Sequence, residues 1–226
     1  TLQATKRQLA VYRQAVLKET FSRAGDNFCK LEDLCDFITK GTTPSKNKMR
    51  SGEGDIPFIK VYNLTFDNSL DFSTDPTFVD TDTHRNALAR SIVYPGDVLM
   101  NIVGPPMGKV SVVPDTFSEW NINQAIARFR CHKELNNKYL AYYLGFADTV
   151  ELMKSKSKAT AGQFNLTLEI CRELTIPVPE ISVQEKIVDE IDERVTQCRN
   201  IEKTIDTTLL QLQSMRQSVL KEAFEG

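Results

Sequence analysis

The chain contains 226 residues, 41% hydrophobic and 26% charged, which is enough to bury the core of one compact domain and leave an appendage. Its formal net charge is −2, so no strong positive field identifies a nucleic-acid partner, and any DNA-binding surface must come from locally segregated charge. The sequence lacks a run of about 18 apolar residues and a signal-peptide pattern, which predicts a cytoplasmic protein without a membrane span.

The first predicted element is a helix over residues 1–25, part of which is repeated at the other end of the chain. Residues 13–21 (RQAVLKETF) recur as residues 216–224 (RQSVLKEAF), with seven of nine positions identical. Both copies have helical periodicity. The first copy offers one apolar face for packing, formed by Leu2, Leu9, Tyr12, Val16 and Leu17.

Residues 26–179 predict a globular α+β domain with a mixed sheet. Short β-rich runs at 56–64, 97–103, 109–113 and 125–131 are separated by Gly, Pro, Asn and Asp. Helical patterns follow at 137–146, 149–156 and 168–174, and residues 175–179 are extended. The five cysteines show no C-x-x-C pair, so we expect reduced thiols at Cys29, Cys35, Cys131, Cys171 and Cys198.

A long helix is predicted for the C-terminal segment, residues 180–226. Ser182 and Glu185 form a capping-box pattern, so the helix would run over about residues 183–224 and be roughly 60 Å long. Its heptad stripe contains Val195, Cys198, Glu202, Ile205, Leu209, Leu212, Arg216 and Val219. The N-terminal helix is too short to cover this stripe, which predicts a dimer; an amphipathic helix packed on its own domain is the alternative. The expected packing residues are Leu9, Val16, Val195, Ile205, Leu209, Leu212 and Val219.

Two basic segments are candidates for DNA binding. In the first, Gly41 and Pro44 impose an irregular backbone, and the hydroxyls and cations suit phosphate contacts; an ordinary solvated loop is the alternative. Its candidates are Lys40, Thr42, Thr43, Ser45, Lys46, Lys48 and Arg50. The second contains Lys154, Lys156, Lys158 and Gln163, whose amide can pair with adenine. Weaker candidates are Lys60, Asn63, Arg85, Arg90, Asn101, Asn123 and Gln124. Core hydrogen bonding is favoured for Asn123 and Gln124, and core packing for Trp120.

No catalytic or metal site is predicted. The segment 104–109 (GPPMGK) has the wrong spacing for a phosphate-binding loop and lacks the aromatic residue of an adenine methyltransferase motif. It is expected to connect two strands. His84 and His132 both lie in polar, turn-rich sequence, where a metal or catalytic role is not favoured.

Several segments, taken in order, resemble the DNA specificity subunit of type I restriction–modification enzymes. They are ITKGTTPS at 38–45, GDIPFIKV at 54–61, PGDVLM at 95–100, GKV at 108–110, NQA at 123–125, YLAYYL at 139–144 and IPVP at 176–179. Each motif is weak alone, but together they cover residues 28–226.

The resemblance implies a non-catalytic subunit that recognises one half-site of a bipartite double-stranded DNA target. It further implies docking to a modification (methyltransferase) subunit and a restriction subunit, with S-adenosylmethionine, ATP and Mg only on those partners. Complete members carry two recognition domains, so this chain resembles a half-length subunit or a C-terminal half, and a half-length chain would form a homodimer through its helices. A coiled-coil adaptor that binds only protein, and less favourably a stand-alone methyltransferase-like enzyme, remain the alternatives.

Overall fold

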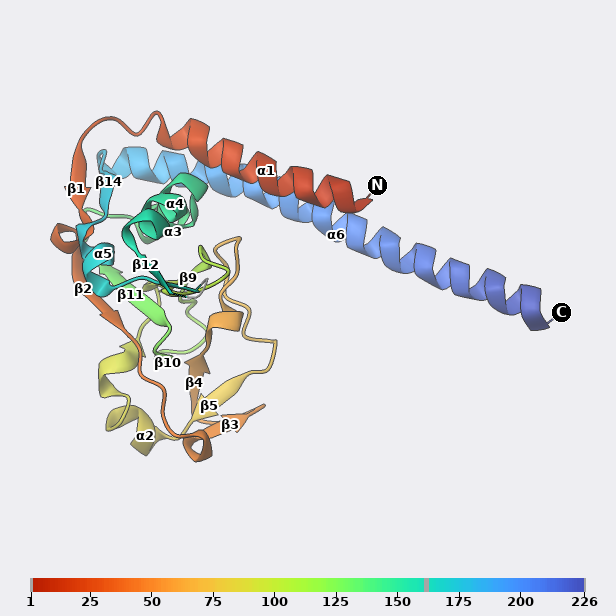
Figure 1. The fold of residues 1–226 in the computed structure, drawn as a ribbon, viewed down its shortest axis with the longest axis horizontal. Helices are drawn as coiled ribbons and strands as arrows, with labels where there is room; N and C mark the ends of the chain where they lie inside the picture. Colours follow the sequence, from red (N-terminus) through yellow and green to blue (C-terminus); the bar gives the residue numbers. More distant parts are fainter. Residues whose placement is uncertain (1, 161–162, 226) are drawn as a thin grey trace.

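The computed structural model describes residues 2–160 and 163–225, in which an α+β domain is attached to one end of a pair of long helices (Figure 1). Helix α1 (Leu2–Phe21) has 20 residues and α6 (Ile181–Glu225) has 45. At 1.5 Å per residue these lengths correspond to about 30 Å and 67 Å, so the distal half of α6 extends beyond α1. We call this helix pair the stalk.

A four-stranded antiparallel sheet lies nearest the stalk. Its order is β2 (Cys35–Lys40), β11 (Ile126–Cys131), β7 (Val98–Asn101) and β9 (Val110–Val112). Every residue of β7 is buried, as expected for a central strand with both faces covered. Helix α3 (Asn137–Gly145) packs against β7 and β9, and Asn136 caps its N-terminus by accepting hydrogen bonds from two backbone amides.

A five-stranded mixed sheet forms the part of the domain farthest from the stalk (Figure 1). Its order is β3 (Met49–Ser51), β5 (Thr77–Val79), β4 (Ile56–Ile59), β10 (Trp120–Ile122) and β6 (Ile92–Val93). Strands β4 and β10 are parallel, so their carboxyl ends meet at one edge. Trp120 is buried and donates to the Phe117 carbonyl at 3.1 Å, in agreement with the expected core role. The short helix α2 (Thr81–Arg85) follows β5.

A small sheet and two helices complete the domain. The small sheet contains β12 (Lys158–Thr160), β13 (Gln163–Asn165) and β8 (Val103–Gly104), while β1 (Phe28–Lys30) pairs with β14 (Thr175–Pro177). Helices α4 (Ala147–Lys156) and α5 (Leu168–Glu173) flank β12 and β13 in the chain. Short 3-10 turns are η1 (Leu31–Asp33), η2 (Lys46–Lys48), η3 (Val61–Asn63) and η4 (Ala89–Ser91). The Gly-Pro-Pro segment lies between β8 and β9, as expected for a strand connection.

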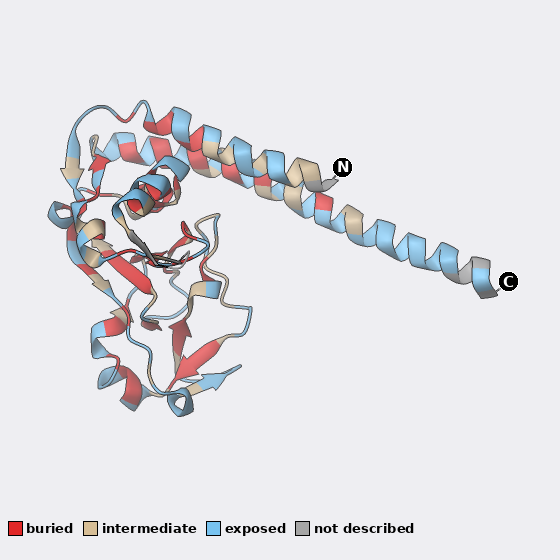
Figure 2. Ribbon diagram, viewed as in Figure 1, coloured by how far each residue is buried: buried red, intermediate tan, exposed pale blue. Residues whose placement is uncertain are grey.

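The stalk shares the main hydrophobic core of the domain. Val16, Leu17 and Phe21 of α1 are buried with residues of α3, and the Phe21 ring lies 5.3 Å from that of Tyr139. Figure 2 shows buried residues on the half of α6 that faces α1 and the domain, and exposed residues on its distal half. The core therefore continues from the sheets into the first half of the stalk.

Three local expectations were wrong. The run at 56–64 is a strand only to Ile59, because Val61–Asn63 forms a 3-10 turn in which the Asn63 side chain accepts from the Lys60 amide at 2.9 Å. Helix α6 begins at Ile181 rather than at a Ser182 capping box, because the Glu180 carbonyl accepts the Val183 and Gln184 amides. Tyr12 is exposed on α1 and does not lie on the packed face.

The stripe residues differ in burial along the stalk. Val16, Val195, Cys198 and Ile205 are buried, while Leu9 and Leu209 are half-buried. Leu212, Arg216 and Val219 are exposed because α1 ends before them: Lys6, near its start, forms an ion pair with Asp206. Glu202, a charged position within the stripe, pairs with Arg13 of α1 at 2.6 Å.

Candidate nucleic-acid interface

The first predicted basic segment begins against the loop that joins β10 and β11. The Gly41 amide donates to the Ile126 carbonyl at 3.1 Å, and the Thr42 amide donates to the Ile122 carbonyl at 3.2 Å. A Cβ atom on Gly41 would lie 2.1 Å from the Ile122 oxygen, so only glycine allows this close approach. Two segments that are 80 residues apart in the sequence are thus held side by side.

Further polar residues lie beside this contact between the first basic segment and the β10–β11 loop. The backbone amide of Gln124 donates to the Thr43 hydroxyl at 3.3 Å. The backbone amide of Asn123 donates to the carbonyl of Ile59, the residue before Lys60, at 3.0 Å. Lys40, Thr42, Thr43, Lys60 and Gln124 therefore follow or end strands β2, β4 and β10, and we call this set the polar rim. Gln124 is exposed, so the expectation that it forms hydrogen bonds in the core was wrong.

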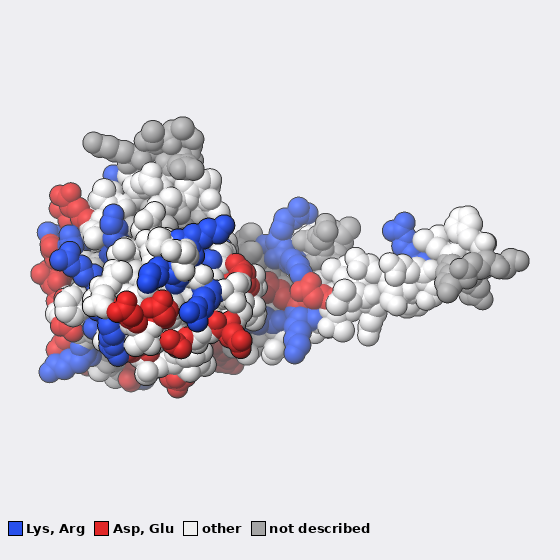
Figure 3. Space-filling model, turned by 90° about the horizontal axis from the view of Figure 1, so that it is seen from below, with Lys and Arg blue, Asp and Glu red and all other residues white. Residues whose placement is uncertain are grey.

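The other cations of this segment lie farther from the stalk. Lys46 and Lys48 are exposed on η2, Arg50 is exposed on β3, and Ser45 donates to the Asn47 side chain at 2.7 Å. Figure 1 places η2 and β3 at the end of the domain opposite α1 and α6. Viewed from that end, basic and acidic side chains alternate on the surface, so the field has both signs (Figure 3).

Some of the predicted cations form ion pairs within the domain and others do not. Within the described residues, no ion pair includes any of the cations of the first segment or the polar rim, which are Lys40, Lys46, Lys48, Arg50 and Lys60. In contrast, Arg85 pairs with Glu119 at 2.7 Å and Lys154 pairs with Glu151 at 2.7 Å. The cations at residues 40–60 therefore retain charge for an anionic ligand.

The second predicted segment lies nearer the stalk. Lys154 and Lys156 are on α4, and Lys154 also lies 5.7 Å from the centre of the Phe164 ring. Lys158 is on β12 and Gln163 on β13, but the side chains of both lie outside the described residues. Strand β13 pairs with β8, which directly follows β7 of the main sheet. The two basic segments thus occupy different parts of the domain (Figure 1).

Two of the weaker candidates are structural. Asn63 is buried and donates to the Asp71 and Thr74 carbonyls at 2.9 and 3.2 Å, while Asn101 is fully buried and holds the Gly-Pro-Pro segment by donating to the Pro106 carbonyl at 2.8 Å. Burial excludes direct contact of either side chain with DNA in this conformation. Arg90 is exposed, and the Asn123 side chain accepts from the Ala125 amide at 3.2 Å.

The sequence did not predict the burial of His84. Its ring is fully buried between α2 and β10, with Nδ1 2.7 Å from the Asn121 side-chain oxygen and Nε2 3.2 Å from Glu119. His132 lies 3.1 Å from Asp36. Within residues 2–160 and 163–225, no cluster of three or more His, Cys, Asp or Glu side chains is placed to hold a metal ion.

Tyr62 is a surface residue that the sequence did not single out. Its ring is 40% exposed and lies 5.4 Å from the Lys60 ammonium, and its hydroxyl donates to the Asp75 carboxylate at 2.8 Å. Hydrogen bonds from Tyr62 and Ser51, together with the Lys60 charge, lower the pKa of the exposed Asp75 carboxylate. The aromatic ring beside Lys60 extends the polar rim, and no motif in the sequence marked it.

An α+β domain on a helical pair, with a rim of basic side chains that form no ion pair among the described residues, is an arrangement that suits a DNA-binding module. The comparison with protein families agrees: residues 26–211 match the type I restriction modification DNA specificity domain. The chain therefore belongs to this family. No helix in the part of the chain that the structure describes has the length and apolarity needed to span a membrane.

Individual relatives support the assignment. The chain is 28% identical over 138 residues to the type I restriction enzyme EcoBI specificity subunit of Escherichia coli, covering 61% of this chain and 28% of the relative. It is 25% identical over 198 residues to the EcoR124I/EcoR124II specificity subunit of the same species, covering 84% of this chain and 46% of the relative. The chain thus spans less than half the length of these relatives.

Solved structures share the fold. A chain from the type I R-M system, studied for its complex assembly and conformational transition, superposes with a TM-score of 0.74 at 22% identity, over 99% of this chain and 53% of that one. The HsdS subunit from Thermoanaerobacter tengcongensis superposes with a TM-score of 0.65 at 20% identity, over 100% of this chain and 53% of that subunit. These similarities confirm the α+β architecture with long helices.

Proposed function

We propose that this chain recognises one half-site of a bipartite DNA target as the specificity component of a type I restriction–modification enzyme. The observation that carries the proposal is the polar rim, whose cations form no ion pair among the described residues, in a member of a DNA specificity family. Lys40 and Lys60 would contact phosphates, and the exposed Gln124 and the predicted Gln163 would offer amides to base edges. The cations of η2 and β3 would extend the phosphate contacts.

The proposed partners are those that the resemblance to type I specificity subunits implies. A specificity subunit without catalytic residues would act by docking a modification subunit and a restriction subunit, which would hold S-adenosylmethionine, ATP and Mg. The chain would then supply recognition, and its partners would supply methyl transfer and cleavage.

The repeated segment suggests how a second recognition domain is recruited. Phe21 is 8% exposed in α1, whereas Phe224, its counterpart in the repeat, is 85% exposed in α6. Residues 207–215 contain no charged side chain, and few charges are visible on the distal part of α6 in Figure 3. A second copy of the chain, packed against this uncovered stripe, would bury it and form a homodimer with two half-site readers.

The half-site proposal is tested with the assembled complex and a radiolabelled DNA pool from which its target is selected. We expect the double variant Lys40→Ala and Lys60→Ala to weaken binding to all sequences alike and to lower the slope of log K against log salt by about 1–2. The variant Gln124→Ala should instead change sequence preference at one base pair, by about 1–3 kcal/mol.

The matched control is Lys18→Ala with Lys133→Ala, which removes the same charge from exposed sites on α1 and before α3. If the control lost as much DNA affinity as the Lys40 and Lys60 variant, the effect would come from net charge rather than from the polar rim, and the proposal would be contradicted. Absence of DNA binding by the complex of the unaltered chain would favour the second candidate, a protein-binding coiled-coil adaptor, which the exposed stripe on α6 also suits.

A further inference from the structure

Besides the shared hydrophobic core, polar contacts join the domain to α6 at three levels along the helix. Near its start, the buried Gln184 side chain donates to the Glu134 and Pro179 carbonyls at 2.9 Å and accepts from the Asn136 amide at 2.9 Å. Two turns later, Asp192 accepts from Lys138 at 2.8 Å and from the Tyr142 hydroxyl. Both of these levels bind α3 or the residues immediately before it.

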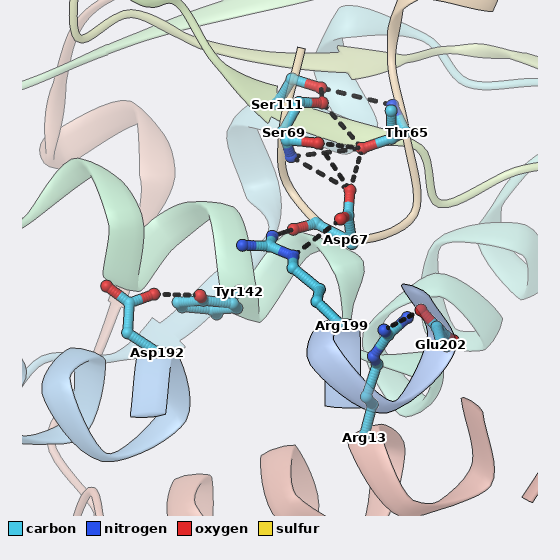
Figure 4. Close-up of polar contacts among 9 residues, drawn as sticks. All are labelled: Arg13, Thr65, Asp67, Ser69, Ser111, Tyr142, Asp192, Arg199 and Glu202. Carbon is cyan, nitrogen blue, oxygen red and sulfur yellow. Dashed lines mark hydrogen bonds and ion pairs between the residues drawn. The ribbon is translucent and has the colours of Figure 1, made fainter. Parts of the chain in front are cut away.

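The third level is a contact between Arg199 and a different part of the domain. Arg199 Nε donates to the Asp67 carboxylate at 2.9 Å, and its Nη2 donates to the Asp67 backbone carbonyl at 2.6 Å (Figure 4). Among the described residues, this is the only side-chain hydrogen bond or ion pair from α6 to the segment between β4 and β5. We call it the Arg199–Asp67 clasp.

The loop that holds Asp67 is braced from the domain side. The Asp67 carboxylate accepts from the hydroxyls of Thr65 and Ser69, at 2.5 and 2.7 Å, and the Ser111 hydroxyl of β9 donates to the Ser69 carbonyl at 2.5 Å (Figure 4). The Val110 amide also donates to the Thr65 carbonyl at 3.1 Å. Movement of Arg199 would therefore be transmitted to β9 and the main sheet rather than absorbed by a loose loop.

The same segment reaches the polar rim. It starts at Lys60, and near its other end the Asp75 carboxylate and carbonyl both accept from Tyr62, which lies beside Lys60. Asn63 ties the segment together through the Asp71 and Thr74 carbonyls. A continuous chain of contacts thus connects the residues proposed to face DNA with the stalk.

The distance between Arg199 and Gln184 along α6 makes the tilt of the domain sensitive to this contact. Gln184 and Arg199 are 15 residues apart, or about 22 Å along the helix, so a shift of about 2 Å at Arg199 would tilt the domain by roughly 5°. Across a domain about 40 Å wide, this tilt moves the far end by about 3–4 Å, close to the rise of one base pair.

We propose that Arg199 and Asp67 are positioning residues that set the angle of the recognition domain on the stalk and thereby the allowed spacing between the two half-sites. This inference deepens the proposed function and rests on it. The clasp touches no DNA, so its loss is expected to leave the bases preferred within each half-site unchanged.

The angle is measured without DNA by electron–electron distance spectroscopy. Two exposed residues, Glu53 between β3 and β4 and Gln197 on α6, are each replaced by a ketone-bearing residue to which a spin label is attached. The distance between the two labels is measured in labelled chains diluted with unlabelled ones. We expect Arg199→Ala to broaden the distance distribution by about 3–4 Å. Arg199→Lys, which keeps the charge but loses the two-pronged fork, should give an intermediate width.

The matched control is Arg194→Ala. Arg194 lies on α6 like Arg199, and its replacement removes ion pairs with Glu19 of α1 and Glu190 of α6 but none with the domain. The functional readout is binding of the assembled complex to duplexes whose half-site spacer is changed one base pair at a time. When the spacer is made one base pair longer or shorter, the complex of the unaltered chain should lose affinity. For Arg199→Ala this loss of affinity should be at least threefold smaller.

Unchanged distances in a folded Arg199→Ala variant would overturn the clasp. A broadened distance distribution with an unchanged spacer profile would overturn its role in spacing. Failure of the unaltered complex to bind DNA would instead refute the half-site function, while the distance measurement would still decide whether the clasp fixes the angle.

Discussion

At the scale of single residues, Asp67 shows how neighbours outweigh burial. Burial alone raises the pKa of a carboxylic acid, but hydrogen bonds from Thr65 and Ser69, together with Arg199, lower the pKa of Asp67 to about 2. Because the folded-state pKa lies below the value of 3.8 for the free side chain, this group stabilises the fold above about pH 4, and the contribution is lost as the pH falls toward 2.

This shift predicts a pH-dependent effect of Asp67→Asn. The variant should be less stable than the unaltered chain by about 2 kcal/mol at pH 7, and the difference should shrink steadily below pH 4. Urea unfolding at a series of pH values measures it. Asp148→Asn is the control, because its exposed carboxylate lies 3.8 Å from an exposed Lys18 and should change stability by less than about 0.5 kcal/mol. A constant difference between pH 7 and pH 2 would contradict the pKa assignment.

Gly41 carries a second prediction at this scale. Gly41→Ala places a methyl group against the Ile122 and Asn123 carbonyl oxygens, 2.1 and 2.3 Å away, so residues 41–43 must move from the β10–β11 loop. We expect a loss of about 1–3 kcal/mol in the free energy of unfolding and weaker DNA binding by the complex. In Gly145→Ala the nearest atom is 3.4 Å away, so this control should be nearly neutral. Equal stability of the two variants would disprove the close approach.

At the scale of elements, the two copies of the repeated segment share seven of nine residues but have different environments. In α1 the repeat is covered by α3 and α6, whereas in α6 it extends past the end of its partner helix. A helix covers an apolar stripe only over the length for which a partner is present. The stripe past Asp206 is therefore the part of the stalk that association with another chain would change.

The dimer proposal is tested on this part of α6. Leu209→Lys with Leu212→Lys should produce monomers with a folded domain, because each buried leucine contributes about 1.5–3 kcal/mol to association. Gln211→Lys with Gln213→Lys adds the same charge to the same turns outside the stripe and should leave the dimer intact. Sedimentation equilibrium distinguishes them, and a monomeric unaltered chain at about 50 μM, a concentration at which such burial would hold a dimer together, would refute the proposal.

At the scale of the whole molecule, the division of labour predicts that the purified chain transfers no methyl group from S-adenosylmethionine to DNA. The family is a DNA specificity family. The segment 104–109 connects two strands and is held by a hydrogen bond from the Asn101 side chain to the Pro106 carbonyl. Activity should appear only when a modification subunit is added, as measured by incorporation of tritiated methyl groups. Incorporation by the rigorously purified chain alone would contradict this prediction and revive the enzyme alternative.

The sequence by itself determined the features that depend on local pattern. Helical periodicity located α1 and α6, alternation of turn residues with apolar runs located β7, β9 and β11, and ordered motifs identified the family. Such patterns are readable because each arises from residues close together in the chain. Strands β3 (MRS) and β12 (KAT) contain one apolar residue each, so no apolar run marks them in the sequence.

Only the tertiary structure decided which polar residues share a surface. Thr43 and Gln124 meet because the segment after β2 is hydrogen-bonded to the end of β10, while Asn63 and Asn101, equally polar in the sequence, are buried as braces for turns. The Arg199–Asp67 clasp joins residues 132 positions apart, with no motif at either end. Side-chain identity specifies which hydrogen bonds a residue can form, but pairing depends on distances that arise only when strands and helices pack around a common core.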